Sequence, residues 1–284
     1  MKNLFDYKIM GKSSAMNVNP NQDGVEVKEW FPSDTEARFK EHLAMPDKKK
    51  ELVKYGWAHP RTFEPTQILY TVNEFGFRGE SFGDISEECA LFIGCSNMFG
   101  VGIFEKDTIP RKFTTMTSIP SVNLGQPGGS LDAAVRVAMY WVPILKPTVI
   151  FLLHPPGIRR ELFLNDMFHP DNGAQLGNRW LQFGLQNARI KDGLDTDRET
   201  FARYFTQPQE EFSNKSRNMY ALQGLANEYQ AILIEASPTD CPKDIARKTL
   251  ARDLAHPGPA FASWFADYFK KIYERRVAER LNEK

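Results

Sequence analysis

Residues 89–102 read CALFIGCSNMFGVG, a short continuous apolar run that turns into a small, polar segment between glycines. Such a run, bounded by turn residues, is typical of a strand buried on both faces of a parallel sheet. Ser96 follows the last residue of the run, Gly94, by two positions. The stretch therefore predicts a central strand with a serine at its carboxyl end.

Short apolar strands alternate with helical segments from this point to the end of the chain. Further strands are predicted at residues 121–125, 146–153 and 231–236, which read SVNLG, KPTVIFLL and AILIEA. Strands that alternate with helices form a parallel sheet with helices on both faces. The predicted fold class is therefore α/β, a three-layer α/β/α doubly wound sheet of the flavodoxin-like type.

Three helices are predicted to form the outer layers of this sheet. One runs through residues 216–229. Residues 130–145 have apolar residues at helical spacing that should face the sheet: Leu131, Val135, Ala138, Met139 and Val142. The last helix begins near Pro259, where a missing N–H costs little. It should bury Phe261, Trp264, Phe265, Tyr268 and Ile272.

The pattern of the chain divides it into two parts. Residues 1–85 are predicted to be an N-terminal extension packed on the core, with residues 1–24, rich in Asn, Ser and Gly, forming an irregular arm. Residues 86–284 are predicted to be the main domain. A polar, aromatic-rich stretch at about 155–207 is predicted to be an insertion in it.

The extension contains weaker signals of its own. Residues 25–31 (VEVKEWF) could be a strand, and residues 35–45 a short helix that cannot continue through the Met-Pro and His-Pro steps that follow. Residues 67–79 alternate apolar and polar residues before a glycine turn. This last pattern predicts an edge hairpin or strand.

The composition argues against several classes of partner and cofactor. Lys and Arg together number 36, as do Asp and Glu, so no overall field favours nucleic acid or a membrane surface. Cys89, Cys95 and Cys241 are odd in number and lack CxxC spacing, which predicts neither disulfides nor a zinc site. Phosphate-loop, dinucleotide, metal-ligand and signal-peptide patterns are absent as well. We expect a soluble cytoplasmic protein without metal or organic cofactor.

Ligands of open parallel sheets bind beyond the carboxyl ends of the strands. Four loops should meet there, namely residues 94–100 (GCSNMFG), 123–130 (NLGQPGGS), 154–157 (HPPG) and 251–258 (ARDLAHPG). The last loop precedes the final helix. It would bring Asp253 and His256 to the same edge as Ser96.

The order of these loops resembles the SGNH hydrolases, also called GDSL-type esterases and lipases, over roughly residues 67–284. Their first block, usually Gly-Asp-Ser, is matched by Gly94-Cys95-Ser96, a variant with Cys in the middle. The stretch NEFGFRG at 73–79 is similar to the Asn-x-x-Gly-x-Arg-Gly sequence that precedes the nucleophile strand in many members.

Two later blocks extend the resemblance. Asn123, Gly125 and Gly128 match the second block, and Asp253 and His256 match the fourth, Asp-x-x-His. The resemblance implies the three-layer fold already predicted and a hydrolase that needs no cofactor.

The resemblance also implies a role for each matched residue. A serine hydroxyl is a weak nucleophile unless an imidazole takes its proton and a further acceptor holds that imidazole in one tautomer. Ser96 would be the nucleophile, His256 the base and then the acid, and Asp253 the residue that orients the ring. The backbone N–H groups of Ser96 and Gly128 would form the oxyanion hole.

The third block departs from the family pattern. An asparagine of Gly-x-Asn-Asp should join the oxyanion hole, whereas this chain reads LLHPPG at 152–157. His154 stands close to the matching place and could donate an N–H instead, or the hole could work with two donors. Asn165-Asp166 spells the missing dipeptide too far downstream, which we interpret as coincidence. Losing one donor costs about 10²–10³ in rate, so weak activity or an unusual substrate is expected.

Each motif also has a purely structural interpretation. A strand that ends in a turn of small residues is common in α/β proteins, Asp253 could cap the following turn, and the glycines of residues 123–130 could serve only strand-to-helix packing. The order of the motifs at successive strand ends favours the catalytic interpretation.

Other chemically able residues are predicted to be structural. His42, His59 and His169 have no spaced partners. Cys95 should point to the other face of the strand end, so it is predicted to be packed rather than reactive.

The predicted insertion leaves two interpretations open. Its aromatic and basic residues could line a sugar-binding groove, because aromatic faces stack on sugars and arginine binds hydroxyls and carboxylates. They could equally form a lid packed on the sheet. The residues are Arg159, Arg160, Phe163, Phe168, Trp180, Phe183 and Arg189.

Together these motifs predict a serine esterase that works through an acyl-enzyme. The predicted substrate is an acyl ester, namely a carbohydrate that carries an acetyl group. The expected partner is a small-molecule or glycan ester substrate. One alternative is an O-acyltransferase, in which a sugar hydroxyl replaces water. Another is a catalytically degraded binding or structural module of the same fold, such as a phage or cell-surface-modification accessory protein.

Overall fold

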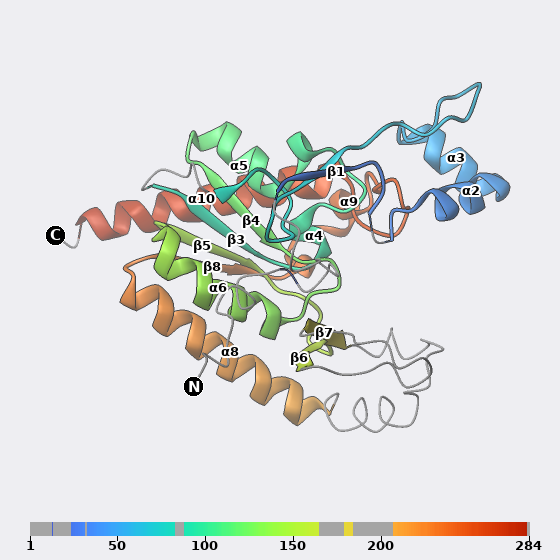
Figure 1. Cartoon of the computed structure of the whole chain (residues 1–284). Helices are drawn as coiled ribbons and strands as arrows, with labels where there is room; N and C mark the ends of the chain where they lie inside the picture. The colour runs from blue at the N-terminus through green and yellow to red at the C-terminus, as the bar shows by residue number, and fades with distance from the viewer. Residues whose placement is uncertain are drawn as a thin grey trace.

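A four-stranded parallel sheet forms the centre of the molecule (Figure 1). The computed structural model describes residues 13, 24–31, 33–82, 88–164, 179–183 and 207–282. The strand order is β4-β3-β5-β8, and the strands are β3 (Ala90–Gly94), β4 (Ser121–Gly125), β5 (Val149–Leu153) and β8 (Ile232–Ala236). All four lie within the stretches predicted from the sequence, so the α/β fold class is confirmed.

Helices cover both faces of the sheet (Figure 1). One pair is α5 (Ile109–Thr117) and α10 (Pro259–Asn282), and the other is α6 (Leu131–Leu145) and α8 (Pro208–Glu228). Phe92 and Phe151 pack on the side of α5 and α10, whereas Leu91 and Leu152 pack on the side of α6 and α8. Because both faces are covered, successive residues of each inner strand are apolar.

The helix starts follow local sequence signals. Ser130 caps α6 by accepting a hydrogen bond from the N–H of Ala133, and Pro259 begins α10 as predicted. The prediction that Met139 faces the sheet is wrong, because the residue is 53% exposed. The buried stripe of α6 is centred near Ala134 and Ala138, and Met139 lies beyond its rim.

The described residues of the N-terminal part form β1 (Glu26–Lys28), α2 (Glu36–Ala44), α3 (Pro46–Lys54) and β2 (Tyr70–Val72). β1 and β2 pair antiparallel. The Met-Pro step ends α2 as predicted, but Pro46 also begins a second helix that the sequence did not suggest. Proline fits there because the first helical N–H has no partner within a helix.

This N-terminal part and the sheet share one hydrophobic core. The ring of Phe31 stacks on that of Phe99, with 4.7 Å between centroids, and the cluster continues through Tyr70 to Phe92 and α10. Residues 24–82 are therefore held to the sheet by apolar contacts.

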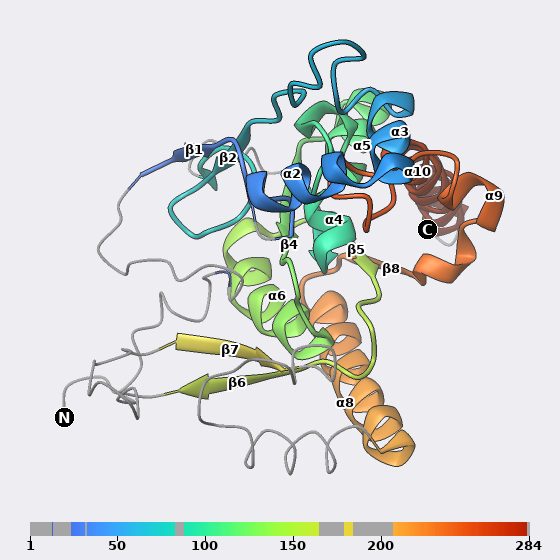
Figure 2. The ribbon, with the colours of Figure 1, turned by 90° about the vertical axis from the view of Figure 1, so that its right-hand side faces the viewer.

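The other elements in the described part of the chain are α4 (Ser96–Phe99), η2 (Glu105–Asp107), β6 (Arg160–Leu164), β7 (Arg179–Phe183), η4 (Pro238–Asp240) and α9 (Lys243–Ala246). β6 and β7 form an antiparallel hairpin within the predicted insertion and lie beside α6 and α8 (Figure 2). A buried ion pair between Arg136 and Glu161 joins α6 to β6, with 2.6 Å between Nε and Oε2. No helix among the described residues has the length and apolar character needed to cross a membrane.

Candidate active site

Ser96 lies at the carboxyl end of β3, as the first residue of the short helix α4. Gly94 ends the strand at φ +155°, and Cys95 occupies the N-cap position of α4. The turn leaves the Ser96 hydroxyl in a largely buried position, with the residue 7% exposed. The serine therefore stands where loops of several strands meet.

Residues of the second predicted loop, at the end of β4, contact α4 and hold it in place. The side-chain amide of Asn123 donates to the carbonyl oxygens of Met98 and Phe99, at 3.2 and 3.4 Å. Gly125 pairs with Gly94 across the sheet, and a Cβ at Gly125 would lie 2.3 Å from the backbone nitrogen of Phe99. Glycine is required here because strand and helix approach too closely for a side chain.

The loop before α10 brings His256 to Ser96. His256 Nε2 lies 2.8 Å from Ser96 Oγ, and His256 Nδ1 lies 2.6 Å from Asp253 Oδ2. The three side chains thus form one continuous hydrogen-bonded chain across 160 positions of sequence. The sequence-predicted residues of the first and fourth blocks do meet.

The surroundings of Asp253 favour its ionised form. Its Oδ1 accepts hydrogen bonds from the N–H groups of Ala255 and His256, both at 3.0 Å. Burial by itself raises the pKa of the Asp253 carboxyl, but the hydrogen bonds and charge of His256 and these N–H groups lower it by more. The pKa therefore lies below its ordinary value of 3.8.

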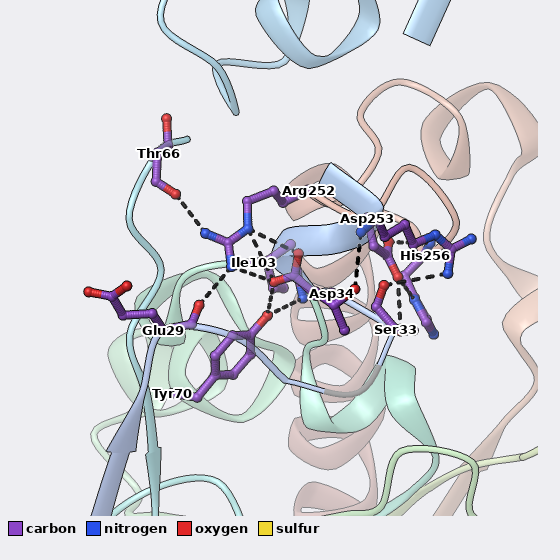
Figure 3. A network of polar contacts seen from close by, with 12 residues as sticks. Glu29, Ser33, Asp34, Thr66, Tyr70, Ile103, Arg252, Asp253 and His256 are labelled. Carbon is purple, nitrogen blue, oxygen red and sulfur yellow. Dashed lines mark hydrogen bonds and ion pairs between the residues drawn. The ribbon is translucent and has the colours of Figure 1, made fainter. Parts of the chain in front are cut away.

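A further polar contact comes from the N-terminal part and was missed at the sequence level. Ser33 Oγ donates to Asp253 Oδ2 at 3.0 Å (Figure 3). Next to this pair, the guanidinium of Arg252 forms a buried ion pair with Asp34, with 2.8 Å between Nη2 and Oδ2. No spacing in the sequence signals a contact between residues 220 positions apart.

Two backbone donors were predicted for the oxyanion hole. The N–H groups of Ser96 and Gly128 have no hydrogen-bond acceptor among the described residues. Gly128 has φ +77°, and a Cβ there would meet nothing within 4 Å. Ser96 lines the cavity described below, whereas Gly128 is not among its lining residues.

His154 follows β5 and lines the same cavity as Ser96. Its backbone N–H donates to the carbonyl of Ala236 at 2.9 Å, and its Nε2 lies 2.7 Å from Glu235 Oε2. The ring is therefore tied to the neighbouring strand β8. Nδ1 is the ring nitrogen left for a ligand. Asn165 and Asp166 lie outside the described residues.

A cavity of about 560 Å³ opens beside Ser96 and His256. Loops after β3, β5 and β8, the start of α8 and the loop that carries His256 contribute to it. Its polar lining includes Asn97, Arg159, Glu211, Asn214, Lys215, Ser237 and Thr239. Donors outnumber acceptors in this set, so the cavity suits a ligand rich in oxygen atoms.

The predicted insertion contributes only in part. Arg159 lines the cavity, and its Nη1 donates to the carbonyl of Gly129 at 3.4 Å. Arg160 is buried, and its guanidinium donates to the carbonyls of Gly157, Arg159 and Glu210. The side chains of Phe163, Phe168, Trp180, Phe183 and Arg189 lie outside the described residues.

The cysteines are all buried and unpaired. Burial raises the pKa of Cys89 to about 11, and it also raises the pKa of Cys241. The expectation that Cys95 points away from Ser96 is wrong, because Cys95 lines the cavity and its Sγ lies 4.0 Å from Ser96 Oγ. The turn at Gly94 ends the alternation of side chains that this expectation assumed.

The other histidines have separate surroundings. His59 Nδ1 accepts from the N–H groups of Arg61 and Thr62, which closes a turn. His42 is buried on α2, and burial lowers its pKa. His169 lies outside the described residues. Within the part of the chain that the structure describes, no cluster of His, Cys, Asp or Glu could hold a metal ion.

No protein-family model matches the chain, and no curated protein matches it. The solved structures that are similar to it include the following two. One, from Desulfitobacterium hafniense DCB-2, is assigned to the lipolytic G-D-S-L family; it has 12% identity and a TM-score of 0.32, with 66% of this chain and 99% of that chain covered. The other is the psychrotrophic esterase EstA from Pseudoalteromonas sp., inhibited by monoethylphosphonate; it has 10% identity and a TM-score of 0.34, with 68% and 100% covered. At these TM-scores the chemistry has to be judged from the site itself.

Proposed function

We propose that this chain is a serine esterase of the SGNH type that works through an acyl-enzyme. Its substrate in this proposal is an acyl ester, namely a carbohydrate that carries an acetyl group. The observation that carries the proposal is the chain of hydrogen bonds from Ser96 Oγ through His256 to Asp253, at 2.8 and 2.6 Å. A serine, an imidazole and a buried carboxylate in this order are what nucleophilic acyl transfer requires.

The reaction follows from the atoms in contact. Ser96 Oγ attacks the ester carbonyl carbon while its proton passes to His256 Nε2, and Asp253 stabilises the imidazolium through Nδ1. The carbon–oxygen bond of the ester then breaks, and His256 gives the proton to the departing alcohol. A water molecule repeats the sequence on the acyl-enzyme, releasing the carboxylic acid and restoring the Ser96 hydroxyl.

The negative oxygen of each tetrahedral intermediate needs donors. We assign this role to the backbone N–H groups of Ser96 and Gly128, which have no acceptor among the described residues. In its doubly protonated form, His154 is a third donor in this proposal, with Nε2–H donating to Glu235 and Nδ1–H left for the oxyanion.

A carbohydrate ester fits the polar lining of the cavity. Asn97, Arg159 and Lys215 offer donors to hydroxyl oxygens, and Glu211 offers an acceptor. Its volume of about 560 Å³ lies in the ordinary range for a small-molecule site.

The test is hydrolysis of p-nitrophenyl acetate and butyrate, with fluorophosphonate labelling read by intact mass. Wild type is expected to turn over the esters and to take one adduct. Ser96→Ala should lose the adduct and at least about 10³-fold in kcat. Ser81→Ala is the matched control, because this exposed serine hydroxyl donates to the Glu74 carboxylate away from the cavity, and it should behave as wild type.

Two other outcomes separate the alternatives. Wild type that neither reacts nor takes an adduct would contradict the proposal and favour a glycan-binding module. Transfer of the acetyl group to an added methyl glycoside, faster than release to water, would identify an O-acyltransferase.

A further inference from the structure

The candidate nucleophilic site contains a contact from outside the loops that form it. Ser33 precedes α2 in the N-terminal part of the chain, and its hydroxyl donates to Asp253 Oδ2 at 3.0 Å (Figure 3). The same oxygen lies 2.6 Å from His256 Nδ1. Ser33 and His256 therefore share one carboxylate oxygen, while Oδ1 accepts two backbone N–H groups.

Ser33 is held in place by contacts that do not involve its hydroxyl. Phe31 and Asp34 exchange backbone hydrogen bonds at 3.0 and 2.8 Å, which closes a tight turn around Ser33. The guanidinium of Arg38 donates to the Ser33 carbonyl at 3.4 Å. Ser33 has φ +70°, which is a left-handed backbone conformation that residues other than glycine rarely adopt.

The turn is anchored to the loop that carries Asp253. Asp34 accepts hydrogen bonds from Arg252 Nε and Nη2, and both side chains are only 1% exposed. Arg252 also stacks on the ring of Trp30, with 3.8 Å from Cζ to the centroid. Residues 33–34 thus bind residues 252–253 through two adjacent contacts, one ionic and one through a hydroxyl.

We propose that Ser33 is a positioning residue for the nucleophilic site, acting through its hydroxyl to fix the Asp253 carboxylate that orients His256. This inference rests on the proposed esterase function. Ser33 does not line the cavity, so it should affect the chemical step and not substrate binding.

Ser33 is not titratable in the ordinary pH range, but two titratable side chains among the described residues also interact with Asp253. His256 contacts it from the same loop, and His42 interacts with its charge from α2. Removing the Ser33 hydroxyl leaves the carboxylate with more negative charge to offer the imidazolium, because one donor is lost. The hydrogen bond between His256 Nδ1 and Asp253 Oδ2 is therefore expected to strengthen, which should shift the NMR resonance of the Nδ1 proton.

The experiment compares Ser33→Ala, Ser33→Gly and Ser33→Thr with wild type. Glycine removes the hydroxyl and suits φ +70°, alanine removes it and keeps the strain, and threonine keeps the hydroxyl. Ser81→Ala is again the matched control, since it removes a hydroxyl-to-carboxylate bond elsewhere in the N-terminal part. The readouts are kcat and KM for p-nitrophenyl acetate, and the NMR resonance of the His256 Nδ1 proton, assigned with His256→Gln.

The alanine and glycine variants should both lose about 10-fold in kcat with KM within about twofold of wild type, and both should shift the resonance of the Nδ1 proton. Threonine should restore the resonance even if the variant melts at lower temperature. A glycine variant with wild-type kcat and resonance would overturn the proposal, because the role would then be backbone packing. The NMR resonance decides this point even if the wild type proves inactive towards esters, an outcome that would count against the esterase alone.

Discussion

Asp253 shows how one buried residue keeps its charge. A carboxylate out of water is unfavourable unless hydrogen bonds replace its hydration. Here Oδ1 accepts two backbone N–H groups and Oδ2 contacts Ser33 and His256. Both carboxylate oxygens therefore have hydrogen-bond partners, and these partners set the ionisation and the orientation of the group.

The lowered pKa of the Asp253 carboxyl predicts a dependence of stability on pH. A group whose pKa is lower in the folded state adds stability above its unfolded pKa, here 3.8, and this stability is lost as the pH falls through the folded value. Wild type should therefore have a higher free energy of unfolding than Asp253→Asn near about pH 6. This difference between the two proteins should shrink as the pH falls towards about pH 3. Urea unfolding at a series of pH values measures the difference.

The matched control for this titration is Asp267→Asn on α10, which changes an exposed carboxylate paired with Lys271. Its difference from wild type should vary little with pH, because exposed ion pairs contribute little. A difference between wild type and Asp253→Asn that stays constant down to about pH 3 would contradict the assignment.

At the scale of elements, the junction of β3, α4 and β4 determines where Ser96 lies. Two glycines face each other at the ends of the strands, Gly94 and Gly125, and Asn123 ties β4 to the carbonyls of α4. The guanidinium of Arg78 donates to the carbonyls of Gly100 and Ile103 just beyond α4. A helix of four residues has little stability of its own, so these contacts hold it.

Gly125→Ala should displace α4 and the serine with it. Its Cβ would lie 2.3 Å from the Phe99 nitrogen and 2.8 Å from the Met98 carbonyl carbon, both backbone atoms that cannot move independently. We expect a loss of about 1–3 kcal/mol in the free energy of unfolding and about 10²-fold in kcat. Urea unfolding and ester hydrolysis provide the two measurements.

The control at this scale is Gly224→Ala near the C-terminal end of α8, where an added Cβ meets nothing within 4 Å. This substitution should raise the free energy of unfolding by about 0.5–1 kcal/mol, because alanine favours helix. Wild-type kcat in Gly125→Ala would show that α4 tolerates the extra atom and that the close approach is unimportant.

At the scale of the whole molecule, the N-terminal part is joined to the loop that carries Asp253 and His256 by a buried polar network. Arg252 pairs with Asp34 and donates to the carbonyls of Thr66 and Glu29, both at 2.8 Å (Figure 3). Tyr70 donates to Asp34 and accepts from the N–H of Gly102. Together with the shared apolar core, this network makes residues 24–82 a structural part of the site.

Asp34→Ala should therefore be strongly destabilising. It leaves the Arg252 guanidinium buried without its partner, for which we expect a loss of about 3–5 kcal/mol in urea unfolding. The double variant Asp34→Ala/Arg252→Met should recover part of this loss, because no unpaired charge remains. The exposed pair gives the comparison, since Asp267→Ala should change stability by less than about 1 kcal/mol.

A single unfolding transition is expected for wild type and for each of these variants, because the two parts share one core. Separate transitions for the N-terminal part and the sheet, or an Asp34→Ala variant as stable as wild type, would contradict this view of the network.

Local patterns in the sequence were sufficient to predict the sheet and the order of its loops. Continuous apolar runs predicted β3, β4, β5 and β8 because a strand covered on both faces must be apolar throughout. The Asp-x-x-His spacing predicted the contact between Asp253 and His256, because the side chains of two residues three positions apart on a tight loop can reach each other. The meeting of this loop with Ser96 followed from the topology of a parallel sheet.

Contacts between distant segments were decided only by the tertiary structure. Ser33 reaches Asp253, and Glu235 occupies one nitrogen of His154. Periodicity records which face of an element is buried, but it does not record which distant side chain packs against that face. These contacts arise from the three-dimensional packing of the N-terminal part, the strands and the loops, and each depends on backbone geometry that short-range sequence patterns do not encode.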